Sequence, residues 1–269
     1  MDLIKNIRNL YNPIQPTVKQ SAGNVTYQEF LPDQSIQSYI YCYWQLKTSR
    51  PLDDPFFYRV VADGCIDIFF ELNNPEESFV MGFCKKYTEF QLDNSFNYVG
   101  VRFLPTMFPQ LFRIDASELS NRFESLNLVI PQIAHFIETH FCPGIANPQI
   151  KIIFDKYFTE LLHHVDSQPD PRLHNAISII LAKDGSVNIE TGLDTGLSPR
   201  QLRRLFHFYI GDSAKTFSKV VRFQNILRGM PSQILHSGKS LMNGYYDQAH
   251  FIKEFTNLYG ITPGKALDK

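Results

Sequence analysis

Four basic side chains in the C-terminal third of the chain, Arg200, Arg203, Arg204 and His207, are spaced so that one helix would present them together. Arginine can form paired hydrogen bonds with guanine, and a glutamine such as Gln201 can form them with adenine. These residue types at this spacing therefore predict recognition of DNA. The alternative is an amphipathic helix whose basic side only faces water.

The local sequence contains the signals that begin such a helix. Ser198 is a preferred N-cap, Pro199 suits the first helical position, and Gln201 stands three residues after the cap. A helix from Pro199 would bury the apolar side formed by Leu202, Leu205, Phe206 and Tyr209. Thr195-Gly196-Leu197-Ser198 supplies the short turn of a helix-turn-helix unit.

The pattern returns 49 residues later. Leu202, Phe206 and Gly211 correspond to Phe251, Phe255 and Gly260, and the cap Ser198 corresponds to Asp247. Two copies predict two helix-turn-helix units. The segment 212–229 would form a rigid helix that places them roughly 34 Å apart, in successive major grooves.

Several anchors keep their order and spacing over this region: Gly196-Leu197-Ser198, Leu202-x-x-x-Phe206, Gly211, Val221-Arg222-Phe223, Gly244-Tyr245-Tyr246-Asp247-Gln248, His250-Phe251, Phe255 and Gly260-Ile261-Thr262-Pro263. In these features the chain from about Arg172 to Lys269 resembles the DNA-binding domain of AraC/XylS-type bacterial transcription regulators. The resemblance implies a sequence-specific regulator whose partner is double-stranded DNA, and it is compatible with contact to RNA polymerase.

The first helix of each unit departs from the family pattern. A Leu/Ile-Ala pair usually stands before each turn, whereas this chain has Thr191-Gly192 and Lys239-Ser240. Glycine inside a helix costs about 1 kcal/mol relative to alanine. We therefore expect short or irregular support helices.

We expect Arg200, Gln201 and Arg204 to contact bases, with Arg203 and His207 nearer the phosphates. The equivalent face of the second unit offers one charge, Lys253, so the first helix should provide most of the specificity. The predicted DNA-binding residues are Ser198, Arg200, Gln201, Arg203, Arg204, His207, Lys215, Lys219, Tyr246, Gln248, His250 and Lys253.

The pattern of the N-terminal part predicts strands, because β-branched and aromatic residues alternate with polar ones. We expect strands at 25–30, 39–46, 56–61, 65–71, 79–84, 87–92 and 97–104, with turns at Asp63-Gly64 and Asn73-Asn74-Pro75. Their number and spacing suggest a barrel or a sandwich. Residues 62–67 and 100–105 resemble the cupin-like sensor domains of some AraC-type regulators. The expected fold class is α+β.

The β-rich half contains no histidine, since the first one in the chain is His135. A histidine-ligated metal is thereby excluded there, and we expect neither a metal nor a cofactor. Tyr39, Tyr41, Tyr43, Trp44, Tyr58 and Arg102 could line a pocket for a small-molecule effector, with Arg102 as the cationic anchor. Alternatively, these aromatic side chains belong to the core.

From Asp115 onward the pattern becomes helical. Asp115 can cap a first helix, and segments 128–141 and 149–165 follow. In the resembled family such helices commonly make dimer contacts, so a homodimer is compatible with the sequence; otherwise they cover the barrel. The polar segment 166–171 contains two prolines and indicates a linker. The expected domains are therefore 1–168, for sensing, and 172–269, for DNA binding.

The net charge of −1 conceals an asymmetry. From Arg172 onward there are 13 Lys and Arg against 7 Asp and Glu, whereas the preceding residues hold 13 against 20. A basic unit following an acidic one is typical of phosphate binding by one domain. The four cysteines lack the spacing of a zinc site or disulfide framework. Without a signal-peptide pattern or a long apolar span, a cytoplasmic protein with no membrane partner is expected.

Two other functions are compatible with parts of the sequence. The β-rich half could be an enzyme, but the chain has no G-x-S-x-G elbow, phosphate loop or defensible pair of carboxylates, so we expect no enzymatic activity. The unusual support segments allow a degenerate regulator that binds another protein and not DNA.

Overall fold

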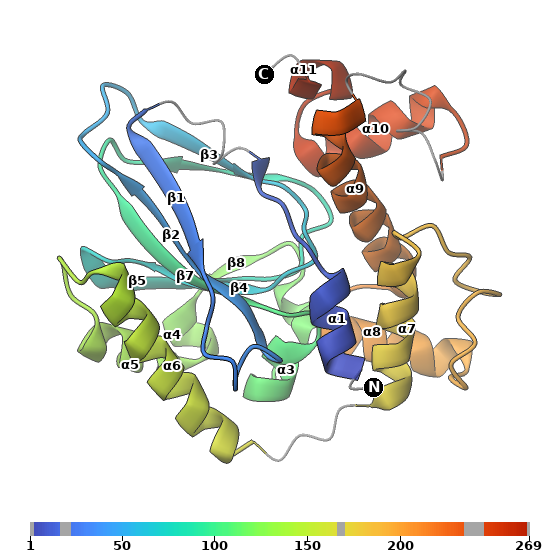
Figure 1. Cartoon of the computed structure of the whole chain (residues 1–269), viewed down its shortest axis with the longest axis horizontal. Helices are drawn as coiled ribbons and strands as arrows, with labels where there is room; N and C mark the ends of the chain where they lie inside the picture. Colours follow the sequence, from blue (N-terminus) through green and yellow to red (C-terminus); the bar gives the residue numbers. More distant parts are fainter. Residues whose placement is uncertain (1–2, 17–22, 166–169, 234–244, 268–269) are drawn as a thin grey trace.

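The computed structural model describes residues 3–16, 23–165, 170–233 and 245–267. Antiparallel strands occupy most of the first half of the chain and helices the second half, which confirms the α+β class (Figure 1). No helix in these described ranges combines the length and the apolar character needed to cross a membrane.

The strands form a six-stranded sheet and a separate two-stranded sheet. The larger sheet has the order β1 (Val25–Phe30), β2 (Ile40–Thr48), β7 (Asn97–Phe103), β4 (Asp67–Glu71), β5 (Asn74–Met81) and β8 (Phe123–Ser125). The smaller sheet pairs β3 (Phe56–Val60) with β6 (Thr88–Leu92). No strand pair joins the two sheets within the described residues, so they form an open pair and not a closed barrel.

All seven expected strands are present, most with bounds shifted by one to three residues, and β5 begins five residues earlier than expected. Glu71 pairs with Asn74, so the hairpin turns at Leu72 and Asn73, and Asn74 already belongs to β5. The expected turn over Asn73-Asn74-Pro75 is therefore placed too late. Sequence patterning misses β8, because three residues are too few to show an alternation.

The two faces of the larger sheet have different partners. Ile68, Phe70 and Val101 are fully buried in the main core, on the face covered by helices. Their neighbours Phe69 and Arg102 lie on the other face, which meets the two-stranded sheet. This alternation is the period of a strand, so the sequence pattern is sufficient to separate the two faces.

Helices line the first of these faces. Two helices lie along it in Figure 1, α5 (Pro131–His140) and α6 (Asn147–His163). Phe154 of α6 stacks on Tyr43 with ring centroids 5.0 Å apart. The helix expected at 128–141 is divided into α4 (Leu126–Val129) and α5, because Ile130 precedes a proline and leaves the helical conformation.

Three shorter elements complete this half: α1 (Leu3–Leu10), α3 (Met107–Phe112) and the 3₁₀ turn η1 (Ala116–Leu119). Asp115 caps η1 as expected, since its side chain accepts a hydrogen bond from the Ser117 amide at 2.9 Å. The patterns read from sequence do not predict α1 or α3.

The C-terminal region contains α7 (Pro171–Ala182), α8 (Pro199–Ile210), α9 (Ala214–Gln233), α10 (Gln248–Tyr259) and α11 (Pro263–Leu267). Shifting the bounds of α8 by 49 residues gives those of α10, which confirms the repeat. With 20 residues, α9 is about 30 Å long and joins the two copies (Figure 1).

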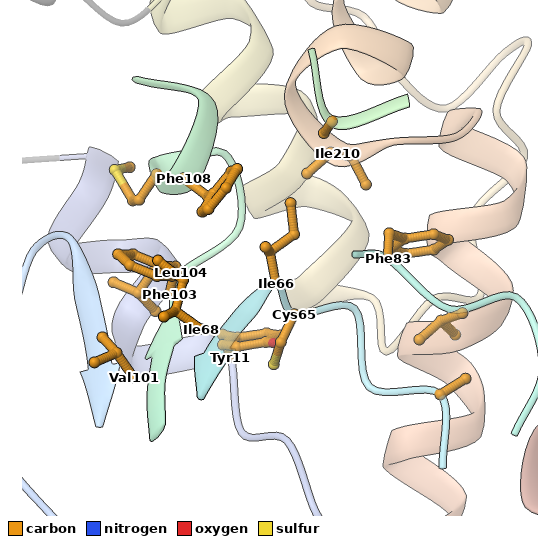
Figure 2. Packing of buried hydrophobic residues seen from close by; sticks show 14 of the residues in the cluster. Tyr11, Cys65, Ile66, Ile68, Phe83, Val101, Phe103, Leu104, Phe108 and Ile210 are labelled. Carbon is orange, nitrogen blue, oxygen red and sulfur yellow. The ribbon is translucent and has the colours of Figure 1, made fainter. Parts of the chain in front are cut away.

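The helical region packs directly on the sheet region. Ile210 of α8 lies beside Ile66, next to Phe83 (Figure 2). Gln224 of α9 donates hydrogen bonds to the carbonyl oxygens of Ile14 and Ala62, at 3.3 and 2.7 Å. One continuous core therefore spans the boundary that the sequence places at residues 168–172, and the division into two domains stays a prediction. Of the expected linker, residues 166–169 lie outside the described residues.

Candidate functional site

The first candidate recognition helix, α8, is fixed at both ends by its own sequence. The Ser198 hydroxyl accepts from the Gln201 amide at 3.3 Å, and Gln201 Oε1 accepts from the Ser198 amide at 3.0 Å. Gly211 ends the helix in the left-handed conformation, with φ 101°. A capping box and a left-handed glycine satisfy backbone groups that a helix end otherwise leaves unpaired.

We expect Ser198→Ala to lower the free energy of unfolding by about 1 kcal/mol, because it removes the oxygen that caps α8. Denaturant unfolding measures this difference. Ser198→Asp should retain most of the stability, since aspartate also caps helices. Ser186→Ala, at an exposed serine outside a cap, is the matched control, and an equal loss there would contradict the assignment.

The basic residues of α8 face solvent. Arg200, Arg203, Arg204 and His207 are all exposed, whereas Leu202, Phe206 and Ile210 are buried beneath them. Within the part of the chain that the structure describes, the three arginines form no ion pair. Their donors are therefore available to an external anionic partner.

Gln201 forms the capping box that its spacing predicts, and this bears on its second predicted role in base contact. Its Oε1 accepts from both the amide and the hydroxyl of Ser198, each at 3.0 Å. Recognition of adenine by glutamine needs the amide oxygen as well as the amide nitrogen. Because the oxygen is engaged in the cap, that paired contact would require the cap to open. Base contact by Gln201 stays a prediction, and Arg200 and Arg204 are the stronger candidates for base recognition.

The second candidate recognition helix, α10, presents a less charged surface. Asp247 caps it by accepting from the His250 amide at 2.7 Å, and Gly260 ends it with φ 96°. Its exposed residues are Gln248, Ala249, His250, Ile252, Lys253 and Asn257, and the almost fully exposed Tyr246 precedes them. As expected, Lys253 is the only Lys or Arg in the helix.

Glu254 holds α10 against α9 and engages two of the predicted DNA-binding residues. It accepts from Arg222 at 2.8 Å, lies 3.3 Å from Lys219 Nζ, and lies 3.8 Å from His250 Nε2. Burial opposes ionisation of Glu254, but the hydrogen bond and charge of Arg222, with Lys219, lower its pKa. Lys219 is therefore partly neutralised, whereas Lys215 is exposed.

The support segment before α8 is irregular, as expected. Residues 186–198 contain turns and no helix, and Gly192 donates to the Asn188 carbonyl at 2.7 Å. The C-terminal end of α8 is supported instead by the sheet region, where Gly211 packs against Phe83 and the carbonyl of Ala116. The corresponding residues of the second unit, Lys239-Ser240 and Gly244, lie outside the described residues.

A cavity of about 380 Å³ lies between the two sheets. It is lined by residues of the larger sheet, including Trp44, Phe69 and Arg102, and by Tyr58 and Phe90 from the smaller one. Trp44 fits this space because its cross-strand partner is Gly100; a Cβ there would come within 2.2 Å of the indole ring. Three of the predicted pocket residues, Trp44, Tyr58 and Arg102, are thus brought together.

The other predicted pocket residues lie elsewhere. Tyr43 is fully buried on the helix-covered face, and its hydroxyl donates to Asp155 Oδ1 at 3.0 Å. The prediction that Tyr43 lines the pocket is wrong, because alternate residues of a strand point to opposite faces. Tyr41 borders a different, more polar cavity beside Arg8, and Tyr39 packs against the main core.

Arg102 is not a free anchor, which corrects a second expectation. Its guanidinium donates to Asp67 at 3.0–3.2 Å and to Glu29 at 3.4 Å, and lies 3.7 Å from Asp63. Burial raises the pKa of Asp67 to about 6, and Asp63 adds to the rise, although the Arg102 charge opposes it. These three carboxylates were not singled out from sequence. Asp63 and Asp67 are acidic residues inside the apolar segment 62–67, which is their only signal there, and Glu29 has none.

The segment 82–87, between β5 and β6, contacts the C-terminal ends of both candidate recognition helices. Lys85 forms an ion pair with Asp212, just after α8, at 2.5 Å. The Tyr87 amide donates to the carbonyl of Asn257 in α10 at 3.1 Å, and Asn257 Nδ2 donates to the Lys85 carbonyl at 3.1 Å. Met81 and Glu89, on either side of this segment, line the cavity. No sequence pattern predicts this connection.

Among the described residues, no group of three or more His, Cys, Asp or Glu side chains is arranged to hold a metal ion. The cysteines there are unpaired; Cys42, Cys65 and Cys84 are buried and Cys142 is exposed.

Residues 28–125 match the family described as a domain of unknown function, DUF6597. No curated protein matches the chain. Among solved structures, ToxT from Vibrio cholerae O395 bound to (E)-4-(8-methylnaphthalen-1-yl)but-3-enoic acid is 10% identical, with a TM-score of 0.43 over 91% of this chain and 99% of that chain. Another ToxT structure from Vibrio cholerae is 12% identical, with a TM-score of 0.42 over 91% of this chain and 98% of that chain. At this level of similarity, the likeness carries no inference about function.

Proposed function

We propose that the protein is a sequence-specific DNA-binding transcription regulator that responds to a small-molecule effector. The observation that carries this proposal is the row of Arg200, Arg203, Arg204 and His207 on α8, which is exposed and free of acidic partners among the described residues. Such a row is suited to phosphates and to guanine edges. The repeat of α8 in α10 and the basic balance of the C-terminal third support the same function.

The two helices have different roles in this proposal. Arg200 and Arg204 of α8 contact bases, and Arg203 and His207 contact phosphates. The single exposed lysine of α10, Lys253, positions the protein on the backbone with Lys215. Because α9 is about 30 Å long, it can separate the helices by nearly one turn of DNA.

The effector would act through the segment 82–87. A ligand that displaces Met81 or Glu89 in the cavity would shift the segment 82–87, which lies between them. This segment contacts the ends of both α8 and α10. An effector can shift DNA affinity only as far as it binds the two arrangements of these helices differently. The cavity and the interface thus form one connected structure.

A salt titration tests DNA binding directly. We expect the logarithm of the binding constant for duplex DNA to fall linearly with the logarithm of salt concentration, by about 0.9 per phosphate contact. Selection from random duplexes should then yield a preferred sequence. A protein that binds no duplex at low salt would contradict the proposal and favour the protein-binding alternative, for which the irregular residues 186–198 are the supporting observation.

Arg204→Ala and Lys253→Ala should affect recognition differently. We expect Arg204→Ala to weaken the preferred sequence by about 1–3 kcal/mol more than unrelated sequences, since a paired contact with guanine is lost. Lys253→Ala should weaken all duplexes alike and lower the salt dependence by about one phosphate contact. Fluorescence anisotropy with preferred and scrambled duplexes measures both effects. Equal, sequence-independent losses in the two variants would refute this division of roles.

A further inference from the structure

The cavity between the sheets is walled mainly by aromatic rings. Six of them are Trp44, Phe69, Phe79, Phe90, Tyr98 and Phe123. They form a connected cluster, with ring centroids 4.5 Å apart for Phe79 and Phe123 and 6.0 Å apart for Trp44 and Phe69. The face of an aromatic ring is electron-rich and attracts cations as well as apolar groups.

The charged side chains at the cavity are predominantly acidic. Asp67 and Glu89 line it, and Asp67 shares Arg102 with Asp63 and Glu29. When all are ionised, three carboxylates surround this one guanidinium, so the cluster keeps an excess of negative charge. Glu89 has Arg59 as its partner at 2.7 Å, but Arg59 itself is not among the lining residues.

An anionic ligand would meet a guanidinium whose positive charge is already compensated by carboxylates. All three nitrogens of Arg102 already face carboxylates, at 3.0–3.7 Å. An incoming anion would be repelled by these carboxylates and by Glu89. A cation instead meets the negative charge of Asp67 and Glu89 together with ring faces, in an environment partly shielded from water. Asp67 also accepts a hydrogen bond from Trp44 Nε1 at 3.0 Å.

We propose that this cavity binds a hydrophobic organic cation of the quaternary ammonium type. The ammonium group lies between Asp67 and Glu89, and the apolar part lies against Phe69, Phe79 and Phe123. The inference specifies the effector class within the proposed function. It can be tested without DNA, so its failure would leave DNA binding intact, and failure of DNA binding would leave this site intact.

The protein supplies its own probe for the test, because Trp44 is the only tryptophan and lies on the cavity wall. Benzyltrimethylammonium should change the Trp44 fluorescence saturably. Its neutral isostere neopentylbenzene should bind roughly tenfold more weakly, since it lacks the cation–ring and cation–carboxylate attraction. Phenylacetate, which has a similar ring but a negative charge, should not bind.

Variants separate the charge effect from simple apolar binding. Glu89 is an exposed residue of β6 whose carboxylate pairs with Arg59. Glu89→Gln should lower the affinity for benzyltrimethylammonium several-fold and leave the affinity for neopentylbenzene unchanged. Glu76→Gln removes the same charge from an exposed site on β5 that does not line the cavity, and it should change neither affinity. Phe79→Leu should lower the affinity for benzyltrimethylammonium, because one aromatic ring face is lost from the cavity wall.

Three results would overturn the proposal. In the first, benzyltrimethylammonium does not bind saturably to the full-length protein. In the second, neopentylbenzene binds as tightly as the cation. In the third, phenylacetate binds more tightly than the cation. An equal effect of Glu89→Gln and Glu76→Gln would likewise overturn it, because the attraction would then be the general charge of the protein and not this cavity.

Discussion

Replacing Arg200, Arg203 and Arg204 together by alanine should reduce affinity for duplex DNA on the order of a hundredfold or more at physiological salt, through lost phosphate and base contacts. The salt dependence should fall by about 0.9 for each phosphate contact removed. Folding should be little affected, since all three side chains are exposed and form no ion pair among the described residues. Anisotropy titrations at several salt concentrations measure the affinity and its salt dependence together.

The matched control removes the same number of positive charges from other parts of the protein surface. Lys47 on β2, Lys156 on α6 and Lys183 after α7 are exposed, so their combined replacement by alanine removes three positive charges away from α8. We expect this control to bind DNA within a few-fold of the wild type. If both triple variants lost affinity equally, net charge and not the face of α8 would be responsible, and the proposed interface would be wrong.

Arg102→Met should lower the free energy of unfolding by about 3–5 kcal/mol near neutral pH, the typical cost of removing one partner from a buried ion pair. The side chains of Arg102, Asp63 and Asp67 are 3%, 10% and 12% exposed, so the remaining carboxylates cannot recover full hydration. Methionine preserves much of the volume of the arginine side chain. The loss of stability therefore results from the missing positive charge and not from an empty cavity. Denaturant unfolding of the two proteins measures it.

This loss should depend on pH in a defined direction. The folded-state pKa of Asp67, about 6, lies above its ordinary value of 3.8, chiefly because of burial. When the pKa of a carboxyl is higher in the folded protein than in the unfolded chain, the free energy of unfolding falls as the pH rises from the lower pKa to the higher one. Without Arg102 the pKa rises further, so the stability gap between Arg102→Met and wild type should narrow from about pH 8 to about pH 5.

A second substitution tests the same assignment. Adding Asp67→Asn to Arg102→Met removes one of the stranded charges and should restore part of the lost stability, because replacing both partners of a buried pair is less costly than replacing one. A double variant less stable than Arg102→Met, or a gap that widens on acidification, would contradict the assignment of Asp67 as the principal partner of Arg102.

The local features of the candidate interface were predictable from sequence. Ser198, Pro199 and Gln201 act within a single helical turn, and Gly211 acts at the following helix end, so a short window contains the relevant interactions. The same holds for α10, whose cap Asp247 and final Gly260 repeat the spacing. The departure at Thr191-Gly192 likewise indicated the irregular support segment that the structure contains.

The predicted effector pocket was only partly right, for a reason visible at β2. Strand alternation separates Trp44 from Tyr43, and a stricter use of that period would have removed Tyr43 from the pocket. The partners of Arg102 could not be deduced in this way, because Glu29 and Asp67 are 73 and 35 residues away in the chain. Nothing local in the sequence indicates which carboxylate such an arginine will meet.

The sequence by itself determined the seven longer strands, the two capped helices and the basic row on α8, because periodicity and capping depend on residues within a few positions of one another. Only the tertiary structure decided that Arg102 is surrounded by three carboxylates, and that the segment 82–87 contacts the ends of both α8 and α10. These features depend on packing between distant segments, where burial and charge pairing are set by neighbours that the chain brings together only on folding.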